Sequence, residues 1–394
     1  MMLLKLALKN LTGAGLRTWL NVIVLSLAFV LIIAVQGLIQ GMNRQAEQAM
    51  IATEVGGGHF QHPAYDPYDP LTLTDAHGPL PAPVASLVAS GQAAAVLVTQ
   101  GTIYPEGRLY TVLVRGIDPG QEILNLPTAF LKEPLRSDAV QVLIGTRLAK
   151  ATGLKQGDEF TLQWRDAHGT FDALDAIVVK VFSTTVQTVD VGQIWVPLDR
   201  LRQMTGLPGQ ATYAVLANGT PAPAPASAAP WVFRSRGDFL ADLRALVKTK
   251  TVGSSIVYVI FLALAMLAIF DTQVLSIFRR RREMGTLMAL GFTRGRVIAL
   301  FTVEGVLYGV LGAVIAAIYG IPLLSWFART GWAMPAGVDS YGFAIGQRLF
   351  PAFSAGLVAG TTLLVLIVTT IVSFLPTRRI AKLKPTDALR GRVS

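Results

Sequence analysis

Long runs of uncharged residues alternate with short basic segments along this chain. The runs cover residues 18–43, 251–270, 297–322 and 349–377, and Glu304 in the third run is their only charged residue. Because a helix needs about 20 apolar residues to cross the hydrocarbon of a bilayer, the pattern predicts four transmembrane helices. The first run is much longer than the apolar core of a cleavable signal peptide, so we expect it to remain as a membrane helix.

The region between the first two runs has a different pattern, with polar residues, turns and short alternating stretches. Residues 111–117, 140–144 and 176–182 each predict a strand, a turn at 157–158 leads into 159–164, and 194–197 precedes a short helix. Helices are expected over 147–152 and 198–204, and the proline-rich stretch 217–230 predicts an exposed loop. Helices over 42–55 and 239–250 would flank this region as two stalks. The fold class is therefore an α-helical membrane protein with a large extracytoplasmic α/β domain between helices 1 and 2.

These patterns divide the chain into nine predicted parts. They are an interfacial helix (1–16), transmembrane helix 1 (17–43), the extracytoplasmic domain with its stalks (44–250), transmembrane helix 2 (251–278), a cytoplasmic loop with a short helix (279–296), transmembrane helix 3 (297–322), an outer loop (323–348), transmembrane helix 4 (349–377) and a cytoplasmic tail (378–394).

Charge fixes the predicted orientation of these parts. The net charge is +10, and the basic excess lies in residues 1–17, 278–296 and 377–394, beside the apolar runs. This is the distribution that keeps basic loops in the cytoplasm. It places both termini there and argues against a surface for nucleic acid. The chain has no cysteine, which excludes disulfides and thiolate metal sites.

Motifs for catalysis are missing from the sequence. It contains no GxxxxGK[ST] loop for phosphate, no H-E-x-x-H and no Ser-His-Asp ordering. We therefore expect no enzyme activity and no cofactor in this chain. If ATP drives the protein, a partner subunit must bind the ATP and magnesium. The predicted spans also carry few polar residues, which argues against a hydrophilic path through the bilayer.

Two small groups of residues could carry a role of their own. Glu304 is a costly charge within a predicted span, and it is either a structural clamp or, with Gly305 and Gly309, part of a switch between helix arrangements. His59 and His62 could share a metal with a nearby aspartate, but spacing fixes no third ligand and no metal site is predicted.

The segment 278–304 carries the most specific signal. Four arginines, 279–282, follow the second apolar run, and a short amphipathic helix then ends at Gly291. A helix held between two spans on their basic side can be moved by a cytoplasmic partner. We interpret it as the coupling helix for a separate ATPase, formed by Arg282, Glu283, Met284, Leu287, Leu290 and Gly291.

The run Arg-Arg-Arg-Glu-Met-Gly-Thr-Leu-Met-Ala-Leu-Gly-Phe-Thr-Arg, with a glutamate in the next helix, resembles the loop of ABC transporter permeases of the FtsX/MacB/lipoprotein-releasing (LolC/LolE-like) superfamily. The outer domain is similar to theirs at Gly58-His59-Phe60-Gln61, Gly116-Ile117-Asp118-Pro119 and Ile144-Gly145-Thr146-Arg147-Leu148-Ala149. The tail is similar at Lys384-Pro385-Thr386-Asp387-Ala388-Leu389-Arg390.

The resemblance implies a permease subunit in the bacterial inner membrane. It would pair with a second permease copy or a paralogue, bind two cytoplasmic ATPase subunits, contact membrane lipid and meet a periplasmic carrier or adaptor. ATP would move the outer domain, and a lipidated protein or lipid would be extracted. The first span ends in Val-Gln-Gly-Leu-Ile-Gln-Gly-Met and lacks the Met-Asn-Gly-Phe of dedicated lipoprotein-releasing subunits. Macrolide or peptide efflux, or FtsX-like signalling to a cell-wall hydrolase, are therefore the alternatives.

Overall fold

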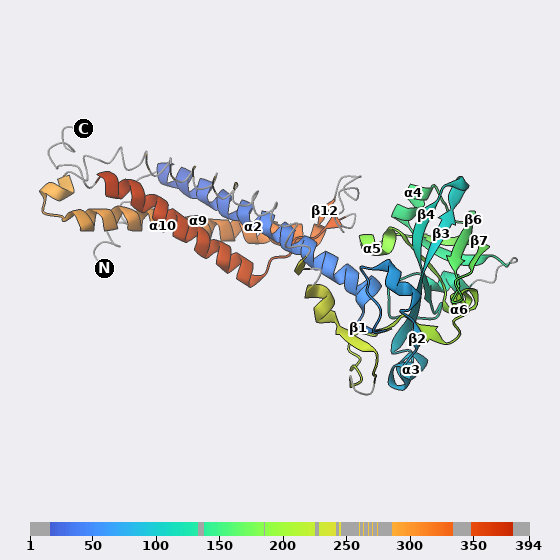
Figure 1. Cartoon of the computed structure of the whole chain (residues 1–394). Helices are drawn as coiled ribbons and strands as arrows, with labels where there is room; N and C mark the ends of the chain where they lie inside the picture. The colour runs from blue at the N-terminus through green and yellow to red at the C-terminus, as the bar shows by residue number, and fades with distance from the viewer. Residues whose placement is uncertain are drawn as a thin grey trace. The chain divides into compact units, whose positions relative to one another are not determined.

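The computed structural model describes residues 16–132, 138–184, 186–224, 228–241, 244–245, 286–333 and 348–380, with five single positions between 260 and 274. The chain divides into two compact units (Figure 1). We call the described residues of 16–43, 286–333 and 348–380 the membrane unit. We call those of 44–245 the sheet domain.

The membrane unit contains three helices that are long and apolar enough to cross a bilayer. They are α2 (Leu16–Met50), α9 (Arg294–Thr330) and α10 (Ala355–Ile380). Hydrocarbon offers no partner for backbone amides, so these apolar runs satisfy them within helices. Three of the four predicted spans are thus found. The remaining one, 251–278, lies outside the described residues apart from the five single positions.

The third predicted span is longer than expected. Helix α9 continues through Pro322 to Thr330, whereas the sequence placed its end at Pro322. A proline inside a membrane helix removes one hydrogen bond, but neighbouring helices can compensate for this loss. A short pairing follows, between β12 (Trp332–Ala333) and β13 (Arg348–Leu349).

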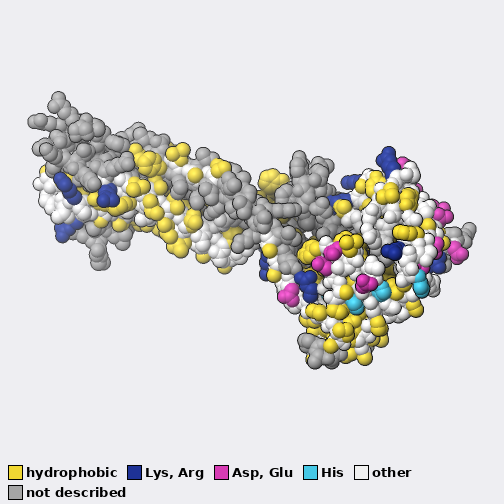
Figure 2. Space-filling view, in the orientation of Figure 1, with side chains coloured by type: hydrophobic (Ala, Val, Ile, Leu, Met, Phe, Trp, Pro, Cys, Tyr) yellow, Lys and Arg dark blue, Asp and Glu magenta, His cyan; other side chains and the backbone are white. Residues whose placement is uncertain are grey.

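The three helices pack along their length through two apolar clusters. One contains Val22 and Leu25 of α2 with Tyr308 of α9 and Val372 of α10. The other contains Phe29, Val30 and Ile32 of α2 with Ala316 and Val365. In Figure 2 the acidic side chains lie on the sheet domain, since the one acid among the described membrane residues, Glu304, is buried.

The sheet domain is built on a nine-stranded sheet in the order β11-β1-β10-β3-β4-β8-β5-β7-β6. Its strands are β1 (Gly58–Gln61), β3 (Ala93–Tyr104), β4 (Tyr110–Ile117), β5 (Val140–Gly145), β6 (Glu159–Arg165), β7 (Phe171–Phe182), β8 (Gln193–Pro197), β10 (Tyr213–Leu216) and β11 (Val232–Ser235). A further pairing of β3 with β6 closes β3, β4, β8, β5, β7 and β6 into a ring. The domain is therefore a small barrel extended by β10, β1 and β11.

Short helices and turns cover the sheet. They are η1 (Ile51–Val55), η2 (Pro70–Thr74), α3 (Ala82–Ala89), η3 (Pro105–Gly107), η4 (Thr128–Lys132), α4 (Thr146–Thr152), α5 (Gln187–Asp190) and α6 (Leu198–Thr205). A separate pairing joins β2 (Gly78–Pro79) to β9 (Gln210–Ala211).

Strand β3 has two different apolar faces because its residues alternate across the sheet. Leu97 belongs to a core filled by side chains of the barrel strands, including Val114, Val142, Leu162 and Ile194. Val96 and Val98 belong to a second core with Trp195 and Tyr213, against which Ala49 and Met50 at the end of α2 pack. The second core is thus where the first stalk meets the sheet.

The three predicted strands and both short predicted helices of this domain are found close to their expected positions, although β7 begins at Phe171. The segments 159–164 and 194–197 are strands as well, within β6 and β8. Strand β3 was not predicted, although it pairs with three others. Its alanine-rich start and continuous apolar run lack the alternation that identifies a strand. The predicted 217–230 loop has no helix or strand in its described part, but its Ala228 is buried in the first core.

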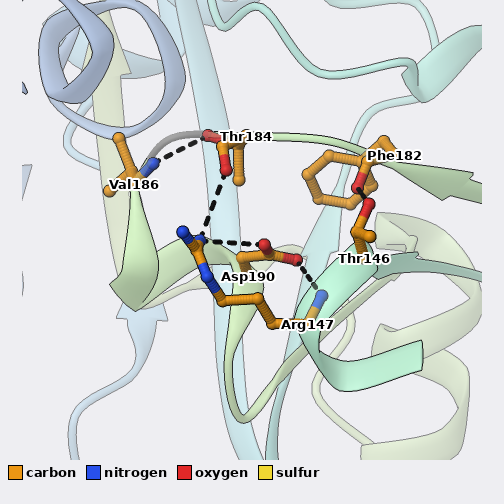
Figure 3. Close-up of polar contacts among 6 residues, drawn as sticks. All are labelled: Thr146, Arg147, Phe182, Thr184, Val186 and Asp190. Atoms are coloured by element: carbon orange, nitrogen blue, oxygen red, sulfur yellow. Dashed lines mark hydrogen bonds and ion pairs between the residues drawn. The ribbon is translucent and has the colours of Figure 1, made fainter. Parts of the chain in front are cut away.

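The run from Gly145 to Arg147 packs tightly around Asp190 (Figure 3). Arg147 donates from its backbone N–H to Asp190 Oδ1 at 2.9 Å and from Nη1 to Asp190 Oδ2 at 3.0 Å. Thr146 Oγ1 donates to the carbonyl oxygen of Phe182. A Cβ on Gly145 would lie 2.7 Å from Asp190 Cα. The buried carboxylate therefore caps the start of α4 and pairs with its arginine.

Replacing Asp190 by alanine should lower the stability of the sheet domain by about 3 kcal/mol, because it leaves the half-buried Arg147 without this carboxylate. Thermal unfolding of the full chain in detergent, followed by tryptophan fluorescence, measures the loss. Asp199→Ala is the matched control, since Asp199 forms an exposed pair with Arg202 that should contribute under about 1 kcal/mol. Equal midpoints for the two variants would contradict the prediction.

Candidate functional site: the turn before α9, the helix contacts and the stalks

The turn that precedes α9 is fixed by its own backbone. Residues 286–289 are helical, and Gly291 follows with φ +93°, a conformation that suits glycine. Phe292 N–H donates to Leu287 O at 3.0 Å, and Gly291 N–H donates to Met288 O at 3.1 Å. This pair of bonds is the Schellman arrangement that ends helices. The predicted stop at Gly291 is confirmed.

The apolar residues of this turn have two different surroundings. Leu287, Met288 and Phe292 pack against Val297 and Phe301 of α9. Leu290, in contrast, is 74% exposed. The predicted apolar face is therefore divided, because Leu287 contacts its own chain while Leu290 faces outward. Met288 and Phe292 were not singled out from the sequence, although their spacing from Val297 and Phe301 suits this packing.

Three of the predicted coupling residues, Arg282, Glu283 and Met284, lie outside the described residues. The binding of an ATPase at this turn stays a prediction.

Glu304 and the glycines of α9 share one buried face. Glu304 is 3% exposed, and Gly305, Gly309, Gly312 and Gly320 are buried with it. A Cβ on Gly309 would lie 3.0 Å from Leu366 Cδ2 of α10. A Cβ on Gly312 would lie 2.9 Å from Leu25 Cβ of α2. The glycines thus allow α9 to approach both neighbours closely. A switching role for Glu304, Gly305 and Gly309 stays a prediction.

The two glycines of the first span, Gly37 and Gly41, contact the segment that leads into α10. A Cβ on Gly37 would overlap the Phe353 ring, and one on Gly41 would overlap the carbonyl oxygen of Phe350. Ala352 N–H also donates to Gly37 O at 2.9 Å, and Thr361 Oγ1 donates to Gln36 Oε1 at 2.6 Å. Gly37 and Gly41 therefore allow close contact with residues 350–354, which form no helix or strand.

Several buried hydroxyls in the described membrane helices donate to the preceding turn of their own helix, although Thr302 Oγ1 and Ser373 Oγ have no hydrogen-bond partner among the described residues. Thr369 Oγ1 donates to Val365 O, Thr377 Oγ1 donates to Ser373 O, and Ser26 Oγ donates to Ile23 O. Hydroxyls bonded to the preceding turn are suited to helix packing. Within the described helices, these residues therefore form packing seams and do not line a polar path.

The two ends of the sheet domain are joined by an ion pair. Arg244 donates from Nε to Glu47 Oε1 at 2.7 Å and from Nη2 to Glu47 Oε2 at 3.1 Å. Glu47 belongs to α2, and Arg244 lies in the helical positions 244–245 that follow the last strand. A two-point arginine–carboxylate contact of this kind fixes orientation, so the first and second stalks are held side by side here.

His59 lies in β1 of the sheet domain and is buried. Its Nε2 lies 2.8 Å from Glu54 O, and Gln61 Nε2 lies 3.4 Å from its Nδ1. Burial lowers the pKa of His59 to about 4. His62 instead packs edge-on against Trp231. Among the described residues no group of three or more His, Asp and Glu side chains could hold a metal ion.

Comparison with known proteins agrees with this architecture. Residues 18–229 match the MacB-like periplasmic core domain, and residues 255–385 match the FtsX-like permease C-terminal family. The chain is 29% identical over 136 residues to the uncharacterized ABC transporter permease MJ1507 of Methanocaldococcus jannaschii, covering 34% of this chain and 31% of that protein. It is 30% identical over 151 residues to the macrolide export ATP-binding/permease protein MacB of Brucella abortus.

That second alignment covers 38% of this chain and 20% of the Brucella protein, so the chain spans a third or less of these relatives. The fold and the matches define a multi-pass membrane protein with a periplasmic α/β domain after its first helix. The chain belongs to the ABC transporter permeases of the MacB/FtsX type.

Replacing Gly312 by leucine should weaken packing of the membrane helices by about 1–3 kcal/mol, because the side chain would collide with Leu25. Gly360→Leu is the matched control, since a Cβ at Gly360 meets no atom within 4 Å. Thermal unfolding in detergent compares the two. A Gly312 variant as stable as the Gly360 variant would refute the packing assignment.

Acid should destabilise the sheet domain through His59. The pKa of His59 is about 4 in the folded protein and 6.5 when the ring is exposed. The free energy of unfolding is therefore unaffected by this group above pH 6.5. It falls by about 3 kcal/mol in total as the pH drops from 6.5 to 4, because the unfolded chain binds the proton more readily. His59→Gln should remove this part of the pH dependence of the unfolding temperature. His168→Gln, at an exposed site, should keep it. Identical pH profiles for both variants would contradict the burial account.

Proposed function

We propose that this chain is the permease subunit of a mechanotransmitting ABC transporter. Two separate ATPase subunits bind the turn before α9 from the cytoplasm, with both termini of the chain on the same side. A second permease copy or a paralogue completes the complex. ATP hydrolysis in the partners then moves the periplasmic sheet domain.

The exposed Leu290 on a rigid turn is the observation that carries this proposal. Its neighbours Leu287, Met288 and Phe292 are packed on α9. A force applied to the turn would therefore displace α9 together with it. Helix α9 in turn contacts α2 through Gly312 and Gly320. Helix α2 continues to Met50, where it packs on the second core of the sheet domain. A continuous set of packed elements supports force transmission along this path.

The chemical class of the cargo is inferred from the described spans. They offer packing seams and no polar lining, which supports a substrate that is taken from outside or from the outer leaflet. Lipidated protein or lipid, passed to a periplasmic carrier or adaptor, fits this route. Membrane lipid is then both the surroundings and the source of the cargo.

Efflux of a macrolide or peptide is a second candidate function. It is favoured by the macrolide export for which the MacB relatives are named and by a hollow of about 410 Å³ in the sheet domain, with Leu80, Asp118 and Arg202 among its lining residues. An FtsX-like scaffold that regulates a cell-wall hydrolase is the non-transport alternative. Acylated protein that co-purifies with the complex would favour extraction, and a hydrolase bound to the sheet domain would favour signalling.

Leu290→Asp should weaken ATPase binding without unfolding the membrane unit, because in the proposed complex Leu290 contacts the partner and is exposed in its own chain. Loss of one buried anchor at an interface costs about 2 kcal/mol or more, which is roughly a 30-fold loss of affinity. The test is co-purification with the cognate ATPase, followed by titration. Leu290→Met is the matched control and should bind normally. Wild-type affinity in the aspartate variant would reject this turn as the docking site.

A further inference from the structure

The first stalk enters the sheet domain through a π-helical turn. Helix α2 ends at Met50, and η1 (Ile51–Val55) follows directly. Thr53 Oγ1 donates to Ala49 O, and Gly57 N–H donates to Leu216 O of β10 at 2.7 Å. This turn places Glu54 over the sheet, where its side chain and its carbonyl oxygen both have partners.

Arg115 of β4 is the centre of the contacts that Glu54 makes. It is only 5% exposed, and its Nη2 lies 3.3 Å from Glu54 Oε1. Its Nη1 donates to the hydroxyl of Tyr213 on β10 at 2.8 Å. The guanidinium also lies 5.4 Å from the centre of the Trp195 ring on β8. One buried cation therefore ties the first stalk to three neighbouring parts of the sheet.

The second stalk reaches the same place through His59. Its ring stacks on Tyr213 with centroids 4.8 Å apart and planes 3° apart, and it contacts Phe239 at 4.6 Å. Phe239 lies in the helical residues 236–241, and Arg234 stands 4.7 Å from its ring. Since His59 also bonds to Glu54 O, the two stalks share one set of partners. We call Glu54, His59, Arg115, Tyr213 and Phe239 the junction cluster.

Stability alone does not explain a buried charge at this position. A buried ion pair loses so much hydration that well-packed apolar residues of similar volume usually stabilise a fold equally well or better. Among the described residues, Arg115 Nε has no acceptor, which adds to the cost. Such a pair fixes the relative orientation of the groups that it joins, because its hydrogen bonds can form in only one arrangement of those groups.

We propose that Arg115 is a positioning residue that holds both stalks in one orientation on the sheet, so that the stalk ends and the sheet move as a single body. This inference deepens the proposed function, since a loose junction would absorb the displacement of α2 before it reached the domain. Arg115 acts through Glu54 and Tyr213 and needs no contact with cargo.

The test measures the orientation of the first stalk directly. Because the chain has no cysteine, spin labels can be attached at Gln48→Cys in the stalk and Lys155→Cys in the loop before β6, both exposed sites. Double electron–electron resonance on the full chain in lipid nanodiscs then gives a distance distribution. Adding Arg115→Met and Glu54→Gln should make this distance distribution about twice as wide. The replacements keep the side-chain volumes but remove the ion pair that fixes the orientation of the stalk.

Two controls separate a lock, meaning contacts that fix the orientation of the stalk, from contacts that only stabilise the domain. The pair Arg147→Met with Asp190→Asn removes another buried ion pair of the same domain, one between α4 and α5, and it should leave the Gln48–Lys155 width unchanged. Labels at Arg108 and Lys155, which lie in loops just before the barrel strands β4 and β6, should report an unchanged width in the Arg115 variant and so show that the domain is folded. An unchanged Gln48–Lys155 width in the Arg115 variant would overturn the proposal, as would equal widening in the Arg147 variant.

A label in the membrane unit at Arg329→Cys, combined with Lys155→Cys, distinguishes failure of the lock from failure of the proposed function. In the complex with the ATPase, ATP should shift the wild-type distance from the membrane unit to Lys155, and the Arg115 variant should lose that shift while ATP is still hydrolysed. If ATP does not change this distance in the wild-type complex, the mechanical function is rejected. The lock is tested separately, by the widths of the Gln48–Lys155 distributions measured in nanodiscs without the ATPase.

Discussion

A backbone amide within hydrocarbon can bond only to its own helix, and this constraint governs the whole molecule. It obliges α2 to remain helical across the membrane, and the helix continues without a break over 35 residues until it reaches the sheet domain. Just beyond the end of this helix, Glu54 lies 3.3 Å from Nη2 of the buried Arg115. In the proposed function, displacement of α2 enters the sheet domain at this contact.

The contacts within the membrane unit complete this arrangement. Gly309, Gly312 and Gly320 let α9 approach its neighbours at backbone distance, and the turn at Gly291 is fixed on α9 by Leu287 and Phe292. Close packing of this kind resists small deformations, so displacement of one helix is passed to the next. The described spans contain hydroxyls, such as those of Thr369 and Thr377, that donate to the preceding turn of their own helix.

Sequence patterns were sufficient where one local rule decides the structure. Uncharged length identified α2, α9 and α10, alternation identified β4 and β5, and Gly291 marked a helix end. The patterns failed where long-range contacts decide. Strand β3 has no alternation because both of its faces are buried in the two cores, and α9 tolerates Pro322 because it lies in a membrane helix.

The buried clusters could not be predicted either. Arg115 interrupts an alternating strand and gives no sign that Glu54 and Tyr213 meet it from distant parts of the chain. The short spacing between His59 and His62 suggests a shared metal, yet the neighbours of His59 are Tyr213 and Phe239. Spacing along the chain could not reveal these partners, since they come from other strands and from the second stalk.

The most direct measurement of the central claim is the response of the periplasmic domain to ATP. Spin labels at Lys155→Cys in the sheet domain and Arg329→Cys at the end of α9 report their separation in the complex with the ATPase. The account predicts that the distance distribution shifts on ATP binding and returns after hydrolysis. A distribution that stays the same while ATP is turned over would contradict it.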